Sequence, residues 1–307
     1  MTNPRIIFMG TPEFAVPSLE KIYTAGYEIA AVITAPDKPS GRGMQIKESA
    51  VKKFALSKNL KILQPERLKA PEFIEELKGL NADLQIVVAF RMLPEVVWNM
   101  PPMGTINLHA SLLPQYRGAA PVNWVIINGE KETGATTFKL RQEIDTGNIL
   151  LQKKIPIRLD ETAGELHDEM MEVGADLLLQ TIAELIKGSL KEIPQSHQKH
   201  ILHQAPKIFT ETCQINWEKS IDDTYNLIRG LSPYPAAFTF LKEKKLKIFK
   251  SEKEMGNPHE KPGEFITDNK TFLKFACTNG YVYTKELQLE GKKKMTVEEF
   301  LKGWRNS

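Results

Sequence analysis

The chain has 307 residues, of which 41% are hydrophobic and 26% charged, and its formal net charge is +3 at pH 7. This composition is that of an ordinary globular protein, and the length suggests two domains. No apolar run reaches the roughly 18 residues that span a bilayer, and the two cysteines, Cys213 and Cys277, form neither a disulfide framework nor a zinc ribbon. We therefore expect a cytoplasmic protein without a membrane segment.

The first half of the chain alternates between strand and helix patterns. Short apolar runs are separated by segments of about ten residues with helical spacing, which indicates βαβ units. Such units predict an α/β fold with a doubly wound, mostly parallel sheet. The expected strands are 5–10, 28–34, 61–63, 83–90 and 105–109. Two further strands within 133–157, joined by a polar turn, are expected at the sheet edge, followed by a long amphipathic helix within 162–188.

The last third differs in pattern and in charge. Residues 189–206 are polar, punctuated by proline and aperiodic, so we interpret them as a linker between a domain 1–188 and a domain 207–307. After one helix, the second domain shows several short alternating segments, which predict a small β-barrel or sandwich. Residues 203–307 hold 18 Lys and Arg against 14 Asp and Glu, whereas the remainder holds 23 against 24. A basic second domain suggests an acidic partner such as nucleic acid.

A candidate catalytic set lies at the ends of two predicted strands. Asn107 and His109 alternate on one face of the strand 105–109, and Asp145 follows in a later turn. An amide and a protonated imidazole can donate to the oxygen that gains charge during acyl transfer, and a carboxylate can take up the proton of an attacking amine. The residue types alone also fit a buried structural histidine beside a turn aspartate, so both interpretations remain open on this evidence.

The motif INLHASLLPQYRGAAP (106–121), followed by DTG (145–147), resembles the folate-dependent formyltransferases. IIFMGTPEFAVPSL near the start and APDKPSGRGMQIKESAVKKFA (35–55) resemble the branch of that family that acts on methionyl-tRNA. The resemblance covers nearly the whole chain and implies a Rossmann-like formyltransferase domain and an OB-like C-terminal domain. It implies that 10-formyltetrahydrofolate is the formyl donor, with no metal. The catalytic positions are then Asn107, His109 and Asp145, and the folate-binding positions are Ser111, Leu112, Leu113 and Pro114.

The sequence departs from many members of this family at VVAFRMLP (87–94), where relatives carry a glycine and one more residue. By resemblance this segment would line the pterin pocket. We expect Arg91 to point outward, as a solvated loop arginine usually does. Three histidines spaced HxxHxxH, His197, His200 and His203, lie in the predicted linker without acidic ligands nearby, and we interpret that spacing as coincidence.

Basic residues at two places are candidates for contact with initiator methionyl-tRNA. The loop 36–47 carries Lys38, Arg42 and Lys47 together with two glycines. By resemblance it would wedge against the acceptor end, with Arg42 as the main contact, although its composition also fits a flexible solvated connection. Lys245 and Lys247 alternate on one face of a predicted strand and could bind phosphates.

Two other functions compete with formylation of methionyl-tRNA. One is formylation of a small amine, such as an amino sugar nucleotide or the glycinamide ribonucleotide of purine synthesis. The other is a catalytically inactive RNA-binding protein, against which the complete Asn107, His109 and Asp145 set argues. We expect a monomer.

Overall fold

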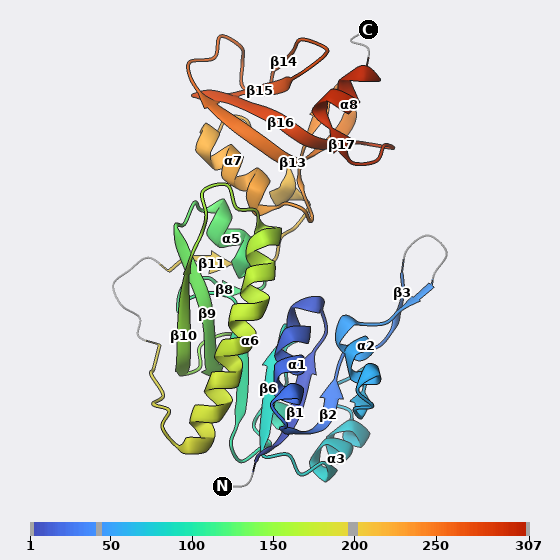
Figure 1. Ribbon diagram of the computed structural model, residues 1–307, viewed down its shortest axis with the longest axis vertical. Helices are drawn as coiled ribbons and strands as arrows, with labels where there is room; N and C mark the ends of the chain where they lie inside the picture. Colours follow the sequence, from blue (N-terminus) through green and yellow to red (C-terminus); the bar gives the residue numbers. More distant parts are fainter. Residues whose placement is uncertain (1–2, 41–44, 196–201, 305–307) are drawn as a thin grey trace. The chain divides into compact units, whose positions relative to one another are not determined.

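The computed structural model describes residues 3–40, 45–195 and 202–304 (Figure 1). The chain forms two compact units, each assembled from stretches that are separate in the sequence. The first unit consists of Met1–Arg117, Gly134–Ile155 and Asp168–His203, and the second of Gly118–Thr133, Pro156–His167 and Gln204–Ser307. None of the described helices is long and apolar enough to span a membrane.

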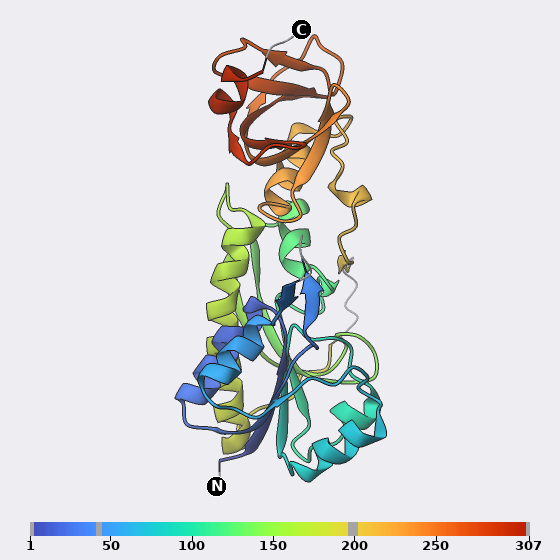
Figure 2. The same cartoon turned by 90° about the vertical axis from the view of Figure 1, so that its right-hand side faces the viewer.

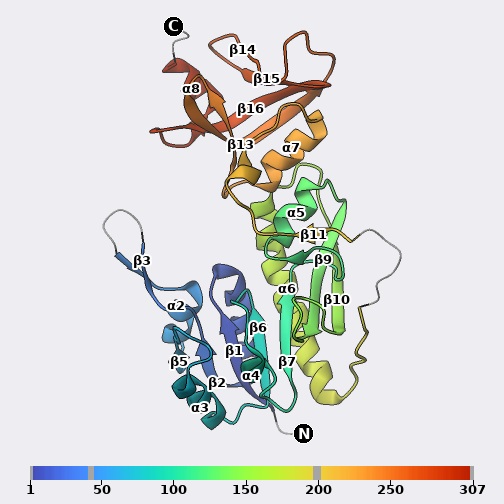
Figure 3. The ribbon, with the colours of Figure 1, turned by 180° about the vertical axis from the view of Figure 1, so that it is seen from behind.

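A seven-stranded sheet with the order β10-β9-β7-β6-β1-β2-β5 forms the centre of the first unit (Figure 3). The five strands from β7 to β5 pair in parallel, and β9 pairs antiparallel with β7. The predicted mostly parallel sheet, with two later strands at its edge, is therefore confirmed. The strands are β1 (Arg5–Gly10), β2 (Glu28–Ile33), β5 (Ile62–Leu63), β6 (Leu84–Val88), β7 (Thr105–His109), β9 (Glu132–Lys139) and β10 (Ile149–Pro156).

Helices cover both faces of this sheet (Figure 2). Ile7 and Met9 of β1 pack toward α3 (Pro71–Gly79) and α4 (Glu95–Trp98), and the alternate residues Ile6 and Phe8 are equally buried. This double burial explains why the strands appear in the sequence as continuous apolar runs. The other helices of this part of the chain are η1 (Glu13–Ala15), α1 (Val16–Thr24), α2 (Ala50–Ser57) and α6 (Ala163–Lys187).

The second unit contains a curled antiparallel sheet, which forms a half-barrel (Figure 2). The Trp217 indole stacks on Phe275 at 4.7 Å and donates to the Thr239 hydroxyl inside its core. The small-barrel prediction is thus confirmed. The strands are β12 (Ala237–Leu241), β13 (Lys244–Met255), β14 (Phe265–Thr267), β15 (Leu273–Cys277), β16 (Gly280–Leu289) and β17 (Met295–Thr296), with helices η2 (Glu211–Cys213), α7 (Ile221–Gly230) and α8 (Val297–Lys302).

Helix α5 (Pro121–Ile127) belongs to the second unit although it lies in the first half of the sequence. It packs against α7, and the Asn123 side chain donates to the carbonyl oxygen of Gly230 at 2.7 Å. The two helices approach so closely that a Cβ on Gly230 would lie 2.6 Å from Cγ1 of Ile127. The second unit therefore depends on residues that the sequence pattern assigns to the first domain.

Two segments without apolar periodicity contain regular pairing. β3 (Lys38–Ser40) and β4 (Gln45–Lys47) form an antiparallel hairpin within the predicted 36–47 loop. Asp37 at its base accepts from Lys52 and Gln64, and the hydrogen bond from Lys52 lowers the pKa of Asp37. In the predicted linker, β11 (Gln204–Ala205) pairs with β8 (Arg117–Gly118), and Ile193 forms a bridge with Ile149.

Candidate active site

Strand β7 carries Asn107 and His109 to its carboxyl end, where polar side chains are expected in an open parallel sheet. Leu108 between them is buried and packs so closely to α6 that a Cβ on Gly174 would lie 2.9 Å from its Cδ2. Because side chains alternate along a strand, Asn107 and His109 occupy the opposite face. No hydrogen bond to the Asn107 carboxamide occurs within residues 3–40, 45–195 and 202–304.

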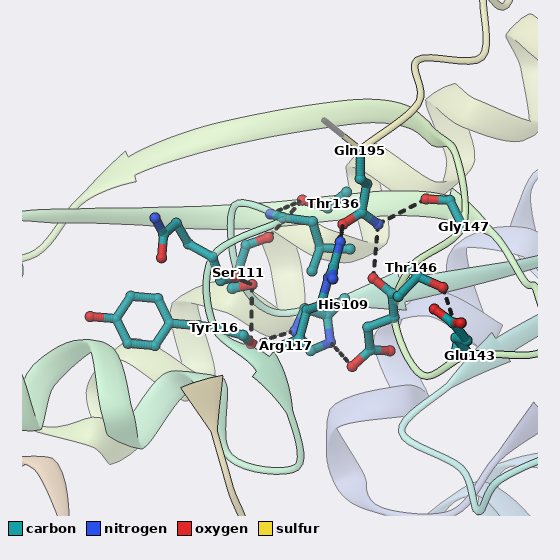
Figure 4. Close-up of polar contacts among 12 residues, drawn as sticks. His109, Ser111, Tyr116, Arg117, Thr136, Glu143, Thr146, Gly147 and Gln195 are labelled. Atoms are coloured by element: carbon teal, nitrogen blue, oxygen red, sulfur yellow. Dashed lines mark hydrogen bonds and ion pairs between the residues drawn. The ribbon is translucent and has the colours of Figure 1, made fainter. Parts of the chain in front are cut away.

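The structure brings His109 and Asp145 together from elements far apart in the sequence. Nδ1 of His109 lies 3.7 Å from Oδ2 of Asp145, and the two side chains are only 7% and 12% exposed. Nε2 of His109 lies 2.9 Å from the carbonyl oxygen of Tyr116 (Figure 4). A carbonyl only accepts, so Nε2 carries the hydrogen. The neutral imidazole then presents its acceptor nitrogen on the side of the carboxylate.

This geometry has a chemical consequence. Two acceptors, Nδ1 of His109 and Oδ2 of Asp145, face each other beyond hydrogen-bond distance. A group with protons to give, such as an amine, is complementary to that pair, and protonation of the imidazole converts the pair into an ion pair. The same polar environment therefore suits removal of a proton from an attacking amine.

Asp145 occupies a turn whose backbone is unusual. Its φ is 54°, in the left-handed region that non-glycine residues seldom adopt. A Cβ at Gly147 would overlap the carbonyl oxygen of Lys139, so only glycine fits there. The Thr146 hydroxyl donates to the carbonyl oxygen of Glu143 at 3.1 Å. Gln195 then bonds to the backbone of the turn, with its Nε2 2.8 Å from the carbonyl oxygens of both Asp145 and Gly147 (Figure 4).

The segment 111–114 folds onto the same end of the sheet. The Ser111 hydroxyl is fully buried and donates to the Gln115 carbonyl oxygen at 2.6 Å, and Leu113 packs in the core with Phe138 and Ile149. Their side chains therefore shape the loop from inside. Leu112 and Pro114 are half-buried, so they are the two side chains of this segment that remain accessible to a bound molecule.

Sequence reasoning missed Thr136, which connects this loop to β9. Its hydroxyl donates to the Ser111 carbonyl oxygen at 2.6 Å and accepts from the Leu113 amide at 3.1 Å. Thr136 lies opposite His109 in the β7–β9 register, so it fixes the loop directly beside the histidine. A threonine in a strand that is paired on both sides has no sequence signal for such a role. Gln195 was missed because it lies in an aperiodic segment.

The candidate tRNA-binding residues have varied local environments. Lys38 is exposed on β3, and Arg42 lies outside the described residues. The prediction that Lys245 and Lys247 share one face of a strand is confirmed, but both are half-buried. Nζ of Lys245 lies 4.3 Å from the Phe238 ring centroid, and Nζ of Lys247 donates to the Pro235 carbonyl oxygen at 3.1 Å.

The segment 87–94 corrects one expectation. Arg91 does not point into solvent: it is half-buried and donates to the backbone carbonyl oxygens of Pro65 and Glu66. Burial lowers the pKa of its guanidinium. Pro65 and Glu66 follow β5, the edge strand of the sheet, and the two guanidinium donors of Arg91 satisfy their carbonyl oxygens.

The histidine spacing in the predicted linker is only partly described. His197 and His200 lie outside the described residues, and the His203 ring stacks on Tyr116 at 5.6 Å. In the part of the chain that the structure describes, no group of three or more His, Cys, Asp or Glu side chains is arranged to hold a metal ion.

Comparison with known proteins identifies relatives over almost the entire chain. Residues 4–182 match the family model "Formyl transferase", and residues 207–305 match "Formyl transferase, C-terminal domain". A methionyl-tRNA formyltransferase of Bacteroides fragilis is 51% identical, with 98% of this chain and 95% of that protein covered. One from Flavobacterium johnsoniae is also 51% identical, covering 99% and 97%, and one from Ruminiclostridium cellulolyticum is 45% identical, covering 97% and 96%.

Solved structures share the fold at low identity. WlaRD, a sugar 3N-formyl transferase crystallised in the presence of dTDP and 5-N-formyl-THF, has a TM-score of 0.68 and 23% identity, covering 95% of this chain and all of that one. HypX from Aquifex aeolicus in complex with tetrahydrofolic acid has a TM-score of 0.66 and 19% identity, covering all of this chain and half of the other.

Proposed function

The chain belongs to the formyl transferase family, and we propose that it transfers the formyl group of 10-formyltetrahydrofolate to the α-amino group of methionine on initiator tRNA. The observation that carries this proposal is the 51% identity over nearly the full length to relatives named methionyl-tRNA formyltransferase. The alternative, an amino sugar nucleotide or other small amine as acceptor, has support only from structures at or below 23% identity, which establish the fold alone.

The site residues divide the chemistry between them in this proposal. The methionine amine attacks the formyl carbon, and its nitrogen forms the new C–N bond while the bond from that carbon to the folate nitrogen breaks. Asn107 donates to the formyl oxygen as negative charge develops there. Asp145 and His109 take the proton that the amine loses, and that proton balances the one the folate nitrogen gains. The 3.7 Å separation of Nδ1 and Oδ2 supports this role.

Binding of the two substrates completes the proposal. Ser111, Leu112, Leu113 and Pro114 form part of the folate site, in which Leu112 and Pro114 offer contact surface and the buried pair keeps the loop in shape. Lys38, Arg42, Lys245 and Lys247 contact the tRNA, most simply at its phosphates.

The proposal extends to domains and location. Residues 1–188 form the catalytic domain and residues 207–307 a tRNA-binding domain, with 189–206 connecting them. An enzyme that modifies initiator tRNA acts where translation starts, so we place it in the cytoplasm, and we propose that it acts as a monomer.

One assay tests the proposed reaction. The protein is incubated with 10-formyltetrahydrofolate and, in parallel, with methionyl initiator tRNA, free methionine or a dTDP-amino sugar. We expect formylation of the methionyl-tRNA alone. Formylation of the sugar nucleotide without that of the tRNA would replace the proposal with its alternative, and no transfer to any acceptor would reject both.

A further inference from the structure

Gln195 holds the turn that carries Asp145, although it follows α6 in a segment that the sequence pattern marks as a linker. Its carboxamide oxygen lies 2.6 Å from Nη2 and 3.1 Å from Nε of Arg117. Its Nε2 lies 2.8 Å from the carbonyl oxygens of Asp145 and Gly147. One side chain therefore joins the start of β8 to both sides of Thr146 in the turn (Figure 4).

The chemistry of these partners fixes the orientation of the carboxamide. A guanidinium only donates and a backbone carbonyl only accepts, so the amide oxygen must face Arg117 and the amide nitrogen must face the turn. Both hydrogens of Nε2 are used, one for each carbonyl. No other side chain of similar size offers two donors and one acceptor in this arrangement.

The backbone of the turn is held at a position that few residues favour. Asp145 has a φ of 54°, which aspartate tolerates better than most non-glycine residues but which still costs free energy that the contacts of the turn offset. The same segment is attached at two further points: Glu192 accepts from Lys139 and Asn148, and Ile193 exchanges backbone hydrogen bonds with Ile149. The Gln195 side chain differs from these two attachments in that it bonds to the backbone of Asp145 itself.

We infer that Gln195, oriented by Arg117, is a positioning residue for formyl transfer: its carboxamide fixes the 143–147 turn and thereby holds the Asp145 carboxylate opposite His109. The inference rests on the proposed function for its kinetic readout. Gln195 acts through the backbone of the turn, so its loss should lower kcat and leave substrate binding nearly unchanged.

Two substitutions separate the donors from the acceptor. Gln195→Glu keeps the size of the side chain and its contact with Arg117, but places a carboxylate oxygen against two carbonyl oxygens. Gln195→Ala removes all four hydrogen bonds. We expect kcat to fall by about 10- to 100-fold in both, the cost of a small misplacement of a reacting group, and further in Gln195→Glu because repulsion displaces the turn. KM for both substrates should change by less than about threefold.

Glu192→Gln is the matched control. It removes a charge from the same segment and the ion pair with Lys139, but leaves the bonds of Gln195 to the turn intact. Its kcat should stay within about twofold of the wild type, since no reacting group moves. A loss of kcat equal to that of Gln195→Glu would show that any loosening of the segment is enough to slow the reaction. That result would overturn the specific role of the carboxamide.

A double-mutant cycle with Asp145→Asn tests whether Gln195 acts through the aspartate. Asn tolerates a positive φ, so the turn is preserved while the carboxylate is lost. If Gln195 serves only to position that carboxylate, Gln195→Ala should cost less than about twofold in the Asp145→Asn background. Multiplication of the two single losses would overturn the inference.

Amide hydrogen exchange separates failure of this inference from failure of the proposed function. Exchange of peptides covering residues 140–149 is measured without substrate, so it does not depend on which amine is formylated. We expect faster exchange in Gln195→Ala and Gln195→Glu than in the wild type and in Glu192→Gln. Unchanged exchange overturns the inference whatever the activity, whereas a wild type that formylates no methionyl-tRNA rejects only the proposed function.

Discussion

The hydrogen bond that His109 makes to the backbone determines which of its ring nitrogens faces Asp145. The Tyr116 carbonyl oxygen holds Nε2 of the imidazole, so the nitrogen that can exchange a proton with a substrate is Nδ1, on the side of Asp145. Neither side chain is more than 12% exposed, so bulk water contributes little to the chemistry between them. In the proposed reaction, stabilisation of the oxyanion then falls mainly to Asn107, in contrast to the shared role that the residue types suggest.

The first prediction concerns these two residues. Asp145→Asn and His109→Ala should each lower kcat by about two to four orders of magnitude, the range for loss of an acid–base or oxyanion group. Asn at position 145 tolerates the left-handed backbone, so the protein should unfold at nearly the wild-type temperature. Single-turnover kinetics and thermal melts check this, and a folded variant with near-normal turnover would make that residue structural.

The second prediction uses the pH dependence of Glu192. Hydrogen bonds from Lys139 and Asn148 lower the pKa of this carboxyl. Its folded-state pKa therefore lies below the unfolded value of about 4.3, so its stabilising contribution is present above that pH and is lost as the pH falls through the folded pKa. The difference in unfolding midpoint between the wild type and Glu192→Gln should be largest near pH 6 and shrink toward pH 3. A difference that does not depend on pH would contradict this.

At the scale of elements, strand β13 and the β3–β4 hairpin present the lysines proposed to contact tRNA. Lys245 and Lys247 each use part of their binding capacity within the protein, on the Phe238 ring and the Pro235 carbonyl oxygen. An ammonium has three donors, so both can still reach a phosphate.

The third prediction concerns the salt dependence of tRNA binding. Replacement of Lys245 and Lys247 by Gln should reduce the steepness of log Kd against log salt by up to about one unit for each phosphate that is no longer neutralised. Lys78→Gln on α3 removes the same kind of charge from the first unit and should leave the slope unchanged. Filter-binding titrations with methionyl initiator tRNA at several salt concentrations measure it. Equal slopes in all variants would remove these two lysines from the proposed tRNA-binding surface.

The fourth prediction tests the α5–α7 packing. Ala normally stabilises a helix by about 1 kcal/mol relative to Gly. At Gly230 the new Cβ would lie 2.6 Å from Ile127, so Gly230→Ala should instead destabilise the protein by about 1–3 kcal/mol through overpacking. Gly79, which likewise ends its helix, meets no atom within 4 Å, so Gly79→Ala should be neutral or stabilising. Chemical denaturation compares the two, and equal effects would contradict the close approach.

The elements that the sequence predicts well are those whose pattern reflects burial. β6 is buried throughout because both of its faces are covered, and every residue except Gln85 is apolar, so LQIVV alone indicates its position. The hairpin of KPS and QIK has no such pattern, since its pairing depends on backbone hydrogen bonds. The site divides in the same way. Asn107, His109 and Asp145 belong to a recognisable motif, so the sequence identifies them. Gln195 bonds to backbone carbonyl oxygens about 50 residues away, which any residue type could supply, so no sequence pattern marks it.

At the scale of the whole molecule, the domain boundaries predicted from the sequence differ from the two compact units of the structure, because α5 belongs to the second unit. A fragment ending at Lys187 contains the complete seven-stranded sheet but loses α7, which packs against α5.

The fifth prediction is that the fragment 1–187 shows the circular dichroism spectrum of a folded α/β protein and binds folate, but melts at a lower temperature than the full chain. Exposure of the α5 surface at Asn123 and Ile127 is the physical reason. Thermal melts and binding of an apolar dye check it. A fragment with full-length stability and no dye binding would show that α5 does not need α7.

The discontinuous second unit also constrains the order of events during synthesis. Helix α5 leaves the ribosome long before α7, the partner it packs against, and at about 5–20 residues per second the roughly 100 intervening residues take about 5–20 s. For that time the surface of α5 at Asn123 and Ile127 lacks the helix that it packs against in the folded protein. The second unit can close only after residues 204–307 have been synthesised, so this stretch of α5 is where we expect nascent-chain chaperones to bind.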